Sequence, residues 1–386
     1  QSFADQPLEG FTYGSVNAPT GKEWESPENL ALNKEQPHAY FFPFQHLDNA
    51  RKVLPENSKY WQSLDGDWKF HWAPDPDSRP KDFYQTEYDV SSWDAIPVPS
   101  SWNIYGIQKD GSQKYGTPIY VNQPVIFQHS VKVDDWRGGV MRTPPANWTT
   151  YKDRNEVGSF RRDFEIPQDW DGREVFISFD GVDSFFYLWI NGQYVGFSKN
   201  SRNTANFNIT PYLQKGKNTV AAEVYRSSDG SFLEAQDMFR LPGIFRTVAL
   251  YSVPKVHFRD LVATPDLDVT YTDGSLTVNA EIRNLDKKAI KDYKVYYSLY
   301  ANKLYSDENT LVDGFLSPVI DKIAPNETGS VQTVLKVKAP NKWSAEFPYR
   351  YTLVAELKDK KNRTVEMVST IVGFRKVEIK DTPASE

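Results

Sequence analysis

Short apolar runs interrupted by turn residues restrict the fold of this chain more than any other feature. Residues 68–72 and 175–179 alternate in the way of half-buried strands. The clearest unit is 184–197, in which Asn191-Gly192 separates two apolar runs. Both central residues of a type I′ turn need a positive φ, so this dipeptide predicts a β-hairpin. Many such strands with almost no helical period predict an all-β chain that begins with an antiparallel sandwich.

The first strand of this hairpin is apolar on both faces. Phe186, Leu188 and Ile190 share one face, and the other carries three aromatic rings, those of Phe185, Tyr187 and Trp189. One face can fill the sandwich core. The aromatic face is either a platform for a sugar or a surface covered by another domain or by the N-terminal arm, and we favour the covered surface because buried aromatics are the common case.

A second unit begins near Val256. Apolar residues alternate along 276–282, 295–299 and 351–357, with polar loops between them. This pattern predicts an immunoglobulin-like β-sandwich, although the chain has no cysteine and therefore lacks the disulfide of antibody domains. We expect an N-terminal arm over 1–59, an antiparallel sandwich over 60–254 and the immunoglobulin-like sandwich over 255–381.

Composition excludes several classes of function. The net charge is −6, so the chain has no electrostatic footprint for nucleic acid or an anionic membrane. There is no run of 18 apolar residues that would span a membrane. The absence of cysteine removes thiol nucleophiles and thiolate metal sites, and the five histidines show no metalloprotease spacing.

The segment 236–246 is the strongest candidate for function. It reads Gln-Asp-Met-Phe-Arg-Leu-Pro-Gly-Ile-Phe-Arg and places an acid among aromatic and cationic side chains around a Pro-Gly turn. Glu234 and Asp237 could be named as a catalytic carboxylate pair. A loop acid is more often solvated or hydrogen-bonded to turn amides, so we do not expect this pair to be catalytic.

The segment also resembles Asp-Gln-Asp-Met-Trp-Arg-x-Ser-Gly-Ile-Phe-Arg of the large retaining β-galactosidases, glycoside hydrolase family 2. Departures from that pattern are Ser227, Ala235, Phe239 and Pro242, and two segments, 107–114 and 134–155, are inserts that could rim a glycan pocket or form an oligomer contact. Further similarity follows the order of the chain: Trp-Glu-x-Pro at 24–27, Leu-Asp-Gly-Asp-Trp-Lys-Phe at 64–70, Val-Pro-Ser-Ser-Trp at 98–102, Tyr-Gly-Thr-Pro-Ile-Tyr-Val-Asn at 115–122, Trp-Ile-Asn-Gly at 189–192, and Val-Gly-Phe-Arg at 372–375.

The resemblance implies that this chain is the N-terminal part of an enzyme that hydrolyses terminal β-D-galactose residues. It also implies a jelly-roll fold for the sandwich over 60–254 and the start of a linker to a further domain over 382–386. In the family the catalytic glutamates lie on a following (β/α)₈ barrel, so no catalytic residue is expected here and the piece alone is expected to be inactive. Asn122 and Asp237 match substrate-binding residues of the family. Asp237 also matches a ligand of a sodium ion shared with the barrel, where magnesium binds as well. A homo-oligomer is expected for the whole enzyme.

Three other interpretations stay open. The chain could be a stand-alone carbohydrate-binding module, or an adhesion-like pair of sandwiches without a role in sugar binding. The same domain plan also occurs in β-glucuronidases and β-mannosidases, from which the 236–246 motif points away.

Overall fold

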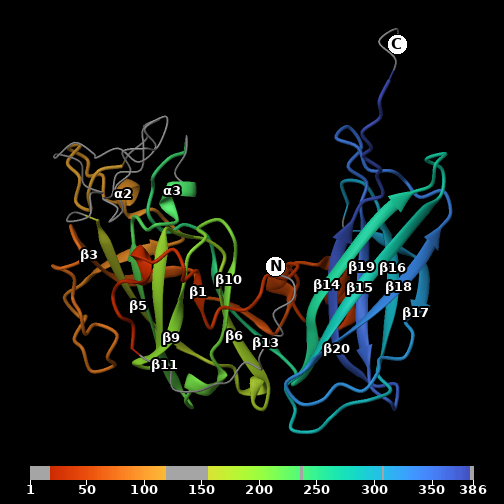
Figure 1. Ribbon diagram of the computed structural model, residues 1–386, viewed down its shortest axis with the longest axis horizontal. Helices are drawn as coiled ribbons and strands as arrows, with labels where there is room; N and C mark the ends of the chain where they lie inside the picture. The colour runs from red at the N-terminus through yellow and green to blue at the C-terminus, as the bar shows by residue number, and fades with distance from the viewer. Residues whose placement is uncertain (1–17, 119–154, 235–237, 307, 383–386) are drawn as a thin grey trace. The chain divides into compact units, whose positions relative to one another are not determined.

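The computed structural model describes residues 18–118, 155–234, 238–306 and 308–382. Contacts within the chain divide these residues into two compact units. One contains 18–36 and 62–251 and is called the N-terminal sandwich, and the other contains 37–61 and 252–382 and is called the C-terminal sandwich. The all-β architecture predicted from the apolar pattern is confirmed (Figure 1). No helix among the described residues is long and apolar enough to span a membrane.

The N-terminal sandwich consists of a large and a small antiparallel sheet. The seven-stranded sheet has the order β1 (Ala31–Leu32), β9 (Gln193–Ser198), β8 (Phe185–Ile190), β11 (Lys217–Tyr225), β5 (Val157–Glu165), β3 (Gly66–Ala73), β4 (Asp94–Val98). The four-stranded sheet has the order β10 (Ala205–Asn208), β6 (Glu174–Phe179), β13 (Val248–Val253), β2 (Trp61–Ser63). The short pair β7 (Val182–Asp183) and β12 (Gly243–Ile244), and the helices η1 (Glu23–Glu25), α2 (Trp102–Tyr105), η4 (Gln168–Trp170), η5 (Thr210–Tyr212) and α3 (Ser231–Glu234), complete this unit.

The predicted hairpin is formed by β8 and β9. Asn191 and Gly192 have φ values of 50° and 76°, as a type I′ turn requires. The side chain of Asn191 also holds the turn, since its amide donates to the Tyr212 carbonyl at 2.9 Å and its oxygen accepts from the Thr219 amide at 2.8 Å. The sequence prediction is therefore confirmed.

Both faces of β8 are buried, for different reasons. Phe186 packs into the core between the two sheets, with its ring 4.8 Å from that of Phe179 and 6.0 Å from that of Phe207. On the opposite face, Phe185, Tyr187 and Trp189 are also buried. They belong to a second core whose other members come largely from β11, from the arm and from the loop between β3 and β4.

Two aromatic residues far away in the sequence close this second core. Trp24 stacks on Tyr225 with the ring centroids 5.4 Å apart. Tyr84 stacks on Trp189 at 4.9 Å, with the ring planes within 8° of parallel. The interpretation of this face as a covered surface is confirmed, and the stand-alone binding module loses its most obvious sugar platform.

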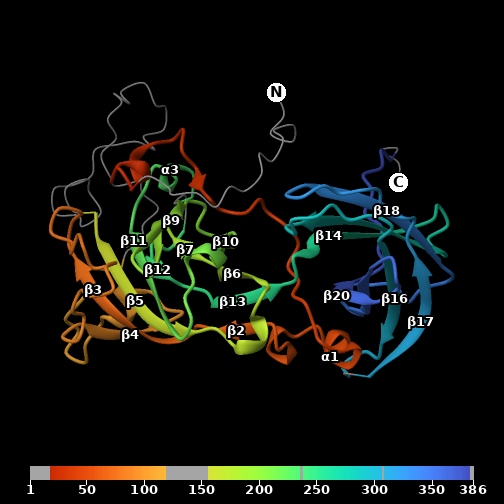
Figure 2. The same cartoon turned by 90° about the horizontal axis from the view of Figure 1, so that it is seen from below.

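The described part of segment 1–59 is shared between the two sandwiches. Residues 18–36 follow the N-terminal sandwich, where β1 adds to the edge of β9 and the Glu35 amide donates to the Asn206 carbonyl at 2.8 Å. Residues 37–61 belong to the C-terminal sandwich, where the Phe44 amide donates to the Met367 carbonyl at 2.7 Å. There the helix α1 (Leu47–Lys52) lies against two strands, β19 (Tyr351–Lys358) and β20 (Thr364–Val372), and is followed by η2 (Pro55–Asn57) (Figure 2).

The C-terminal sandwich has the seven strands expected of an immunoglobulin-like domain, in sheets of three and four. The first sheet has the order β14 (Val256–Leu267), β15 (Gly274–Asn284), β18 (Thr328–Val337), and the second has the order β17 (Asn309–Leu316), β16 (Lys294–Asn302), β19 (Tyr351–Lys358), β20 (Thr364–Val372). The alternating residues Leu276, Val278, Ala280 and Ile282 all point into the core between the sheets. The period-2 pattern therefore identified the buried face of β15 correctly.

We predict that Trp24→Ala destabilises the N-terminal sandwich by about 3–5 kcal/mol, because it opens a cavity over the aromatic face of β8. Native-state hydrogen exchange of the β8 and β11 amides measures this unit separately. Leu30→Ala is the control, because Leu30 lies on the same arm but is largely exposed. An equal effect of the two substitutions would show that Trp24 does not support this core.

Candidate functional site

Both site residues predicted from the sequence, Asn122 and Asp237, lie outside the described residues. The same holds for the insert 134–155 except for Asn155. The structure does describe the segments that lead to these residues. They are 115–118 before Asn122, and 226–234 and 238–246 on the two sides of Asp237.

A buried ion pair lies where these segments meet the sheet. Glu156 precedes β5 and Arg226 follows β11, and the Arg226 guanidinium lies 2.6 Å from the Glu156 carboxylate. Their side chains are 0% and 1% exposed. The other carboxylate oxygen of Glu156 accepts hydrogen bonds from Trp102 Nε1 at 2.9 Å and Asn103 Nδ2 at 3.1 Å. The buried carboxylate is thus fully satisfied, as a charge in such a place must be.

Arg226 also reaches the two segments of interest. Its second terminal nitrogen donates to the Thr117 carbonyl at 3.0 Å and to the Arg240 carbonyl at 3.3 Å. Thr117 lies five residues before Asn122, and Arg240 lies three residues after Asp237. One guanidinium therefore ties together the backbone segments next to both predicted site residues.

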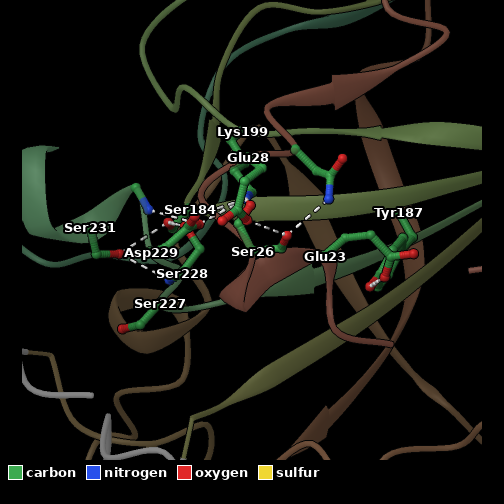
Figure 3. Close-up of polar contacts among 12 residues, drawn as sticks. Glu23, Ser26, Glu28, Ser184, Tyr187, Lys199, Ser227, Ser228, Asp229 and Ser231 are labelled. Carbon is green, nitrogen blue, oxygen red and sulfur yellow. Dashed lines mark hydrogen bonds and ion pairs between the residues drawn. The ribbon is translucent and has the colours of Figure 1, made fainter. Parts of the chain in front are cut away.

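Amide and hydroxyl contacts fix the segment that follows Arg226. Asn155 and Ser227 exchange two hydrogen bonds, from the Asn155 amide to the Ser227 carbonyl at 2.7 Å and from the Ser227 amide to the Asn155 side-chain oxygen at 2.9 Å. Further on, the hydroxyl of Ser184 lies 2.6 Å from that of Ser228 and 3.1 Å from that of Ser231 (Figure 3). These contacts are buried, so they hold the start of α3 against the end of β7.

The N-terminal arm holds the same segment from the other side. Lys199 and Asp229 form a buried ion pair at 2.9 Å, and Lys199 Nζ also donates to the Ser26 carbonyl at 2.7 Å (Figure 3). The backbone amide of Asp229 donates to the Trp24 carbonyl at 2.9 Å. The arm, the end of β9 and the segment before Asp237 are therefore joined through one lysine and one aspartate.

Two further acids lie beside these contacts. Asp183, at the end of β7, is largely buried and lies 3.2 Å from the Arg202 guanidinium. Burial raises the pKa of Asp183 to about 6, and the neighbouring Arg202 charge opposes part of this rise. Glu234 accepts from the Ser201 amide at 2.9 Å and from the Ser201 hydroxyl at 2.5 Å. Glu234 is thus occupied with a loop amide, as we expected of a structural acid.

Apolar side chains are exposed around this end of the sandwich. Met238 and Phe239 follow Asp237 in the sequence, and Phe239 is 61% exposed. Ile104 and Tyr105 of α2 are about half exposed and lie close by, since the Trp102 amide donates to the Pro242 carbonyl at 3.3 Å. The insert 107–114 continues from α2 as a tight loop. At its end, Lys114 Nζ lies 2.9 Å from the Asp94 carboxylate, and the Tyr115 hydroxyl donates to the same carboxylate at 2.6 Å. We call these exposed residues of 104–105 and 238–239 the apolar rim.

In the part of the chain that the structure describes, no group of three or more His, Asp or Glu side chains could hold a metal ion. The sodium ligand expected from the resemblance is Asp237, which lies outside this part. The prediction that Asp237 binds sodium is therefore not tested by the described residues and stays a prediction.

Comparison with known families covers nearly all of the chain. The family described as "Glycosyl hydrolases family 2, sugar binding domain" matches residues 61–254. A second family, "Glycosyl hydrolases family 2", matches residues 256–375. The chain belongs to glycosyl hydrolase family 2.

Curated relatives agree with this assignment. The chain is 39% identical over 360 residues to a β-galactosidase of Priestia megaterium. This alignment covers 93% of the chain and 32% of that relative. It is 35% identical over 350 residues to a β-galactosidase of Halalkalibacterium halodurans. This second alignment covers 91% of the chain and 31% of that relative. The chain thus spans about a third of the length of these relatives.

Solved structures of glycosidases share the fold. A β-glucuronidase of Bacteroides uniformis superposes with a TM-score of 0.61 at 21% identity, over 82% of this chain and 32% of that one. A β-glycosidase of Bacteroides vulgatus superposes with a TM-score of 0.56 at 24% identity, over 82% of this chain and 34% of that one. At these identities the likeness concerns the architecture alone.

The sequence analysis missed the polar residues that organise this end of the family 2 sandwich. Glu156, Lys199 and Arg226 each stand directly beside a strand that is buried on both faces. A charged residue next to a buried strand needs an oppositely charged or hydrogen-bonding partner. These three charged residues beside apolar runs were therefore the sequence signal for a buried polar network. The identity of the partner depends on the pairing of strands, which the sequence does not specify by itself.

We predict that Arg226→Met destabilises the N-terminal sandwich by about 3–5 kcal/mol, because it leaves the Glu156 carboxylate buried without its countercharge. Lys217→Met is the matched control, since Lys217 on β11 pairs with Asp163 at 2.9 Å but both side chains are exposed. The control should change the free energy of unfolding by less than about 1 kcal/mol. Similar values for both variants in urea unfolding would contradict a special role of the buried pair.

We predict that Asp183 makes stability fall as pH rises from about 4 to about 6. The folded chain keeps the proton up to about pH 6, whereas the unfolded chain loses it near the ordinary value of 3.8, so the folded state binds more protons in this window. Asp183→Asn should remove this contribution and make the sandwich more stable at pH 7. Urea unfolding at a series of pH values tests this, with the exposed Asp67→Asn as control. An unchanged pH profile for Asp183→Asn would refute the assignment.

Proposed function

We propose that this chain is the N-terminal part of a retaining β-galactosidase that hydrolyses terminal non-reducing β-D-galactose residues. The observation that carries the proposal is the identity of 39% and 35% to two β-galactosidases over more than nine-tenths of the chain. The chemistry of retaining hydrolysis requires two carboxyl groups about 5–5.5 Å apart. In this proposal both lie in a catalytic barrel that follows the two sandwiches in the longer protein, and the 386-residue chain alone is inactive.

The role of the present chain is to complete the sugar pocket. We propose that Asn122 and Asp237 contact the galactosyl residue, because an amide and a carboxylate suit sugar hydroxyls that both donate and accept. Arg226 supports this role, since it holds the backbone near both residues through Thr117 and Arg240. The apolar rim of 104–105 and 238–239 would then be covered by other parts of the longer protein, which accounts for its exposure in this chain.

Metal binding is part of the same proposal. A sodium ion at Asp237 would be completed by oxygen ligands of the barrel, and a magnesium ion would bind in the barrel alone. A carboxylate is a fitting ligand for such hard cations. We also propose that the whole enzyme is a homo-oligomer, as the resemblance implies.

The alternatives differ in their support. The stand-alone sugar-binding module is disfavoured, because Phe185, Tyr187 and Trp189 are buried under the arm and the β3–β4 loop. A β-glucuronidase remains the second candidate, since structures with that activity share the fold. Their sequence identity to this chain, about 21%, is far below the 39% of the first β-galactosidase relative. We therefore favour a β-galactosidase over a β-glucuronidase.

The deciding experiment compares the 386-residue chain with the protein translated through to its native stop codon. Aryl β-galactoside, β-glucuronide and β-mannoside are the substrates. Turnover of the galactoside by the long form alone is the expected result. Turnover by the short chain, or no turnover of any substrate by either form, would sink the proposal.

We predict that Asp237→Ala lowers kcat/KM of the long form for the galactoside by on the order of 100-fold or more, because a charged partner of the sugar is lost. The response of activity to replacing sodium by potassium should disappear with it. The stability of the chain should change by less than about 0.5 kcal/mol, as for a surface residue. Kinetics and sodium response like those of the wild type would refute both roles of Asp237.

A further inference from the structure

A cavity of about 510 Å³ lies at one end of the C-terminal sandwich, outside everything described so far. Three connections form its wall: the β15–β16 connection, the β17–β18 connection and the β19–β20 turn. The lining residues are Ala289, Ile290, Lys291, Tyr293, Lys322, Asp359, Lys360 and Arg363. All of them belong to the described part of one compact unit.

The charge of this lining is one-sided. It holds four cationic side chains and one acid, in a chain whose net charge is −6. Lys291, Lys322 and Lys360 are exposed and, among the described residues, have no hydrogen-bond or ion-pair partner. Like charges gathered around one cavity without partners raise its potential and attract anions.

The acid in the lining does not cancel this surplus. The Asp359 carboxylate accepts from Arg363 Nε at 2.8 Å and from the backbone amides of Lys361 at 2.9 Å and Arg363 at 3.0 Å. Hydrogen bonds from Arg363 hold the pKa of Asp359 below its usual value, so it stays charged and bound to the turn. Asp359 therefore fixes the β19–β20 turn, with Lys360 beside it, and leaves the three lysines unpaired.

The backbone brings two of the lysines close together. Ile290 and Ile323 exchange both backbone hydrogen bonds at 3.0 Å, and the Ile320 amide donates to the Tyr293 carbonyl at 2.8 Å. Lys291 directly follows Ile290 and Lys322 directly precedes Ile323, so the Ile290–Ile323 bridge brings the backbones of the two lysines close together. Like charges at such close positions repel each other. Both lysines line the cavity, and a bound anion would relieve their repulsion.

The size and the uncharged wall narrow the class of ligand. A volume of about 510 Å³ is far larger than a single inorganic anion needs and falls in the range of sites for small organic ligands. Tyr293 contributes a partly exposed ring, and Ala289 and Ile290 contribute apolar surface. Rings of this kind pack on the C–H faces of sugars, while ammonium and guanidinium groups bind carboxylates and sulfates.

We propose that this cavity of the C-terminal sandwich binds an oligosaccharide carrying carboxylate or sulfate groups. Lys291, Lys322 and Lys360 bind the anionic groups, and Tyr293 packs against a sugar ring. The site would hold an acidic glycan on the protein while its terminal sugars are processed elsewhere. The inference stands without the hydrolase activity, because binding to the 386-residue chain can be measured directly.

The test is isothermal titration calorimetry of the 386-residue chain at low ionic strength. The probes are trigalacturonate, a sulfated galactan trisaccharide, neutral galactotriose and sodium sulfate. We expect at least one of the two anionic trisaccharides to bind, and the tighter one identifies the preferred anionic group. Its affinity should fall clearly at 0.15 M salt, where charges are screened beyond about 8 Å.

Matched variants locate the binding. The double substitution Lys291→Glu/Lys322→Glu should weaken binding by on the order of tenfold or more, since it reverses two charges of the lining. Lys336→Glu/Lys338→Glu makes the same charge change at exposed positions of the same sandwich, outside the cavity, and should leave the affinity within about twofold. Thermal unfolding of each variant confirms that the sandwich is intact.

Four results would overturn the proposal. They are no binding of either anionic trisaccharide, equal binding of neutral galactotriose, equal binding of sodium sulfate, or equal loss of affinity in the two double variants. The first two refute an anionic glycan as ligand. The third would show a site for simple anions, and the fourth would show a general effect of charge.

Discussion

The ion pair between Glu156 and Arg226 is the contact on which the functional end of the N-terminal sandwich depends. It stands at the paired ends of β5 and β11, in the middle of the seven-stranded sheet. The polar contacts to the carboxylate come from two other parts of the chain: Trp102 and Asn103 lie on α2, and Arg226 lies in the segment after β11. A buried charge of this kind contributes little net stability, but it penalises every arrangement in which its partners are misplaced. The pair therefore acts mainly by specifying one loop arrangement.

The arm residues 18–36 complete this arrangement from the outside. Trp24 fills the second core, and its carbonyl, together with that of Ser26, receives donors from Asp229 and Lys199. Packing and polar contacts thus come from the same short stretch of chain. A segment with no strand or helix period can therefore adopt one conformation, because it packs on an apolar surface. That surface can in turn be apolar because the arm covers it.

Local patterns predicted the strands well and the contacts between distant segments poorly. Asn191-Gly192 identified its turn because the φ angles depend on those two residues alone. The alternation of Leu276, Val278, Ala280 and Ile282 identified a buried face for the same local reason. By contrast, Trp24 and Tyr225 are about 200 residues apart in the chain, and Glu156 and Arg226 are 70 apart. Their contacts depend on the order of the strands in the sheet. Many different strand orders are compatible with the same apolar periodicity, so the sequence pattern does not select one. The candidate residues Asn122 and Asp237 came from resemblance, and the structure describes only their neighbours.

The edges of the seven-stranded sheet also matter for how the protein behaves in solution. A strand edge with free amides and carbonyls is a template for pairing with another chain. On one side the two residues of β1 occupy the edge of β9, and so short a strand offers little to a further partner. On the other side, β4 contains Pro97, which has no amide to donate. The arm thus has a protective role in addition to its part in the core, because β1 pairs with Phe197 and Ser198 of β9 and the Asn33 side-chain amide donates to the Val195 carbonyl at 2.8 Å.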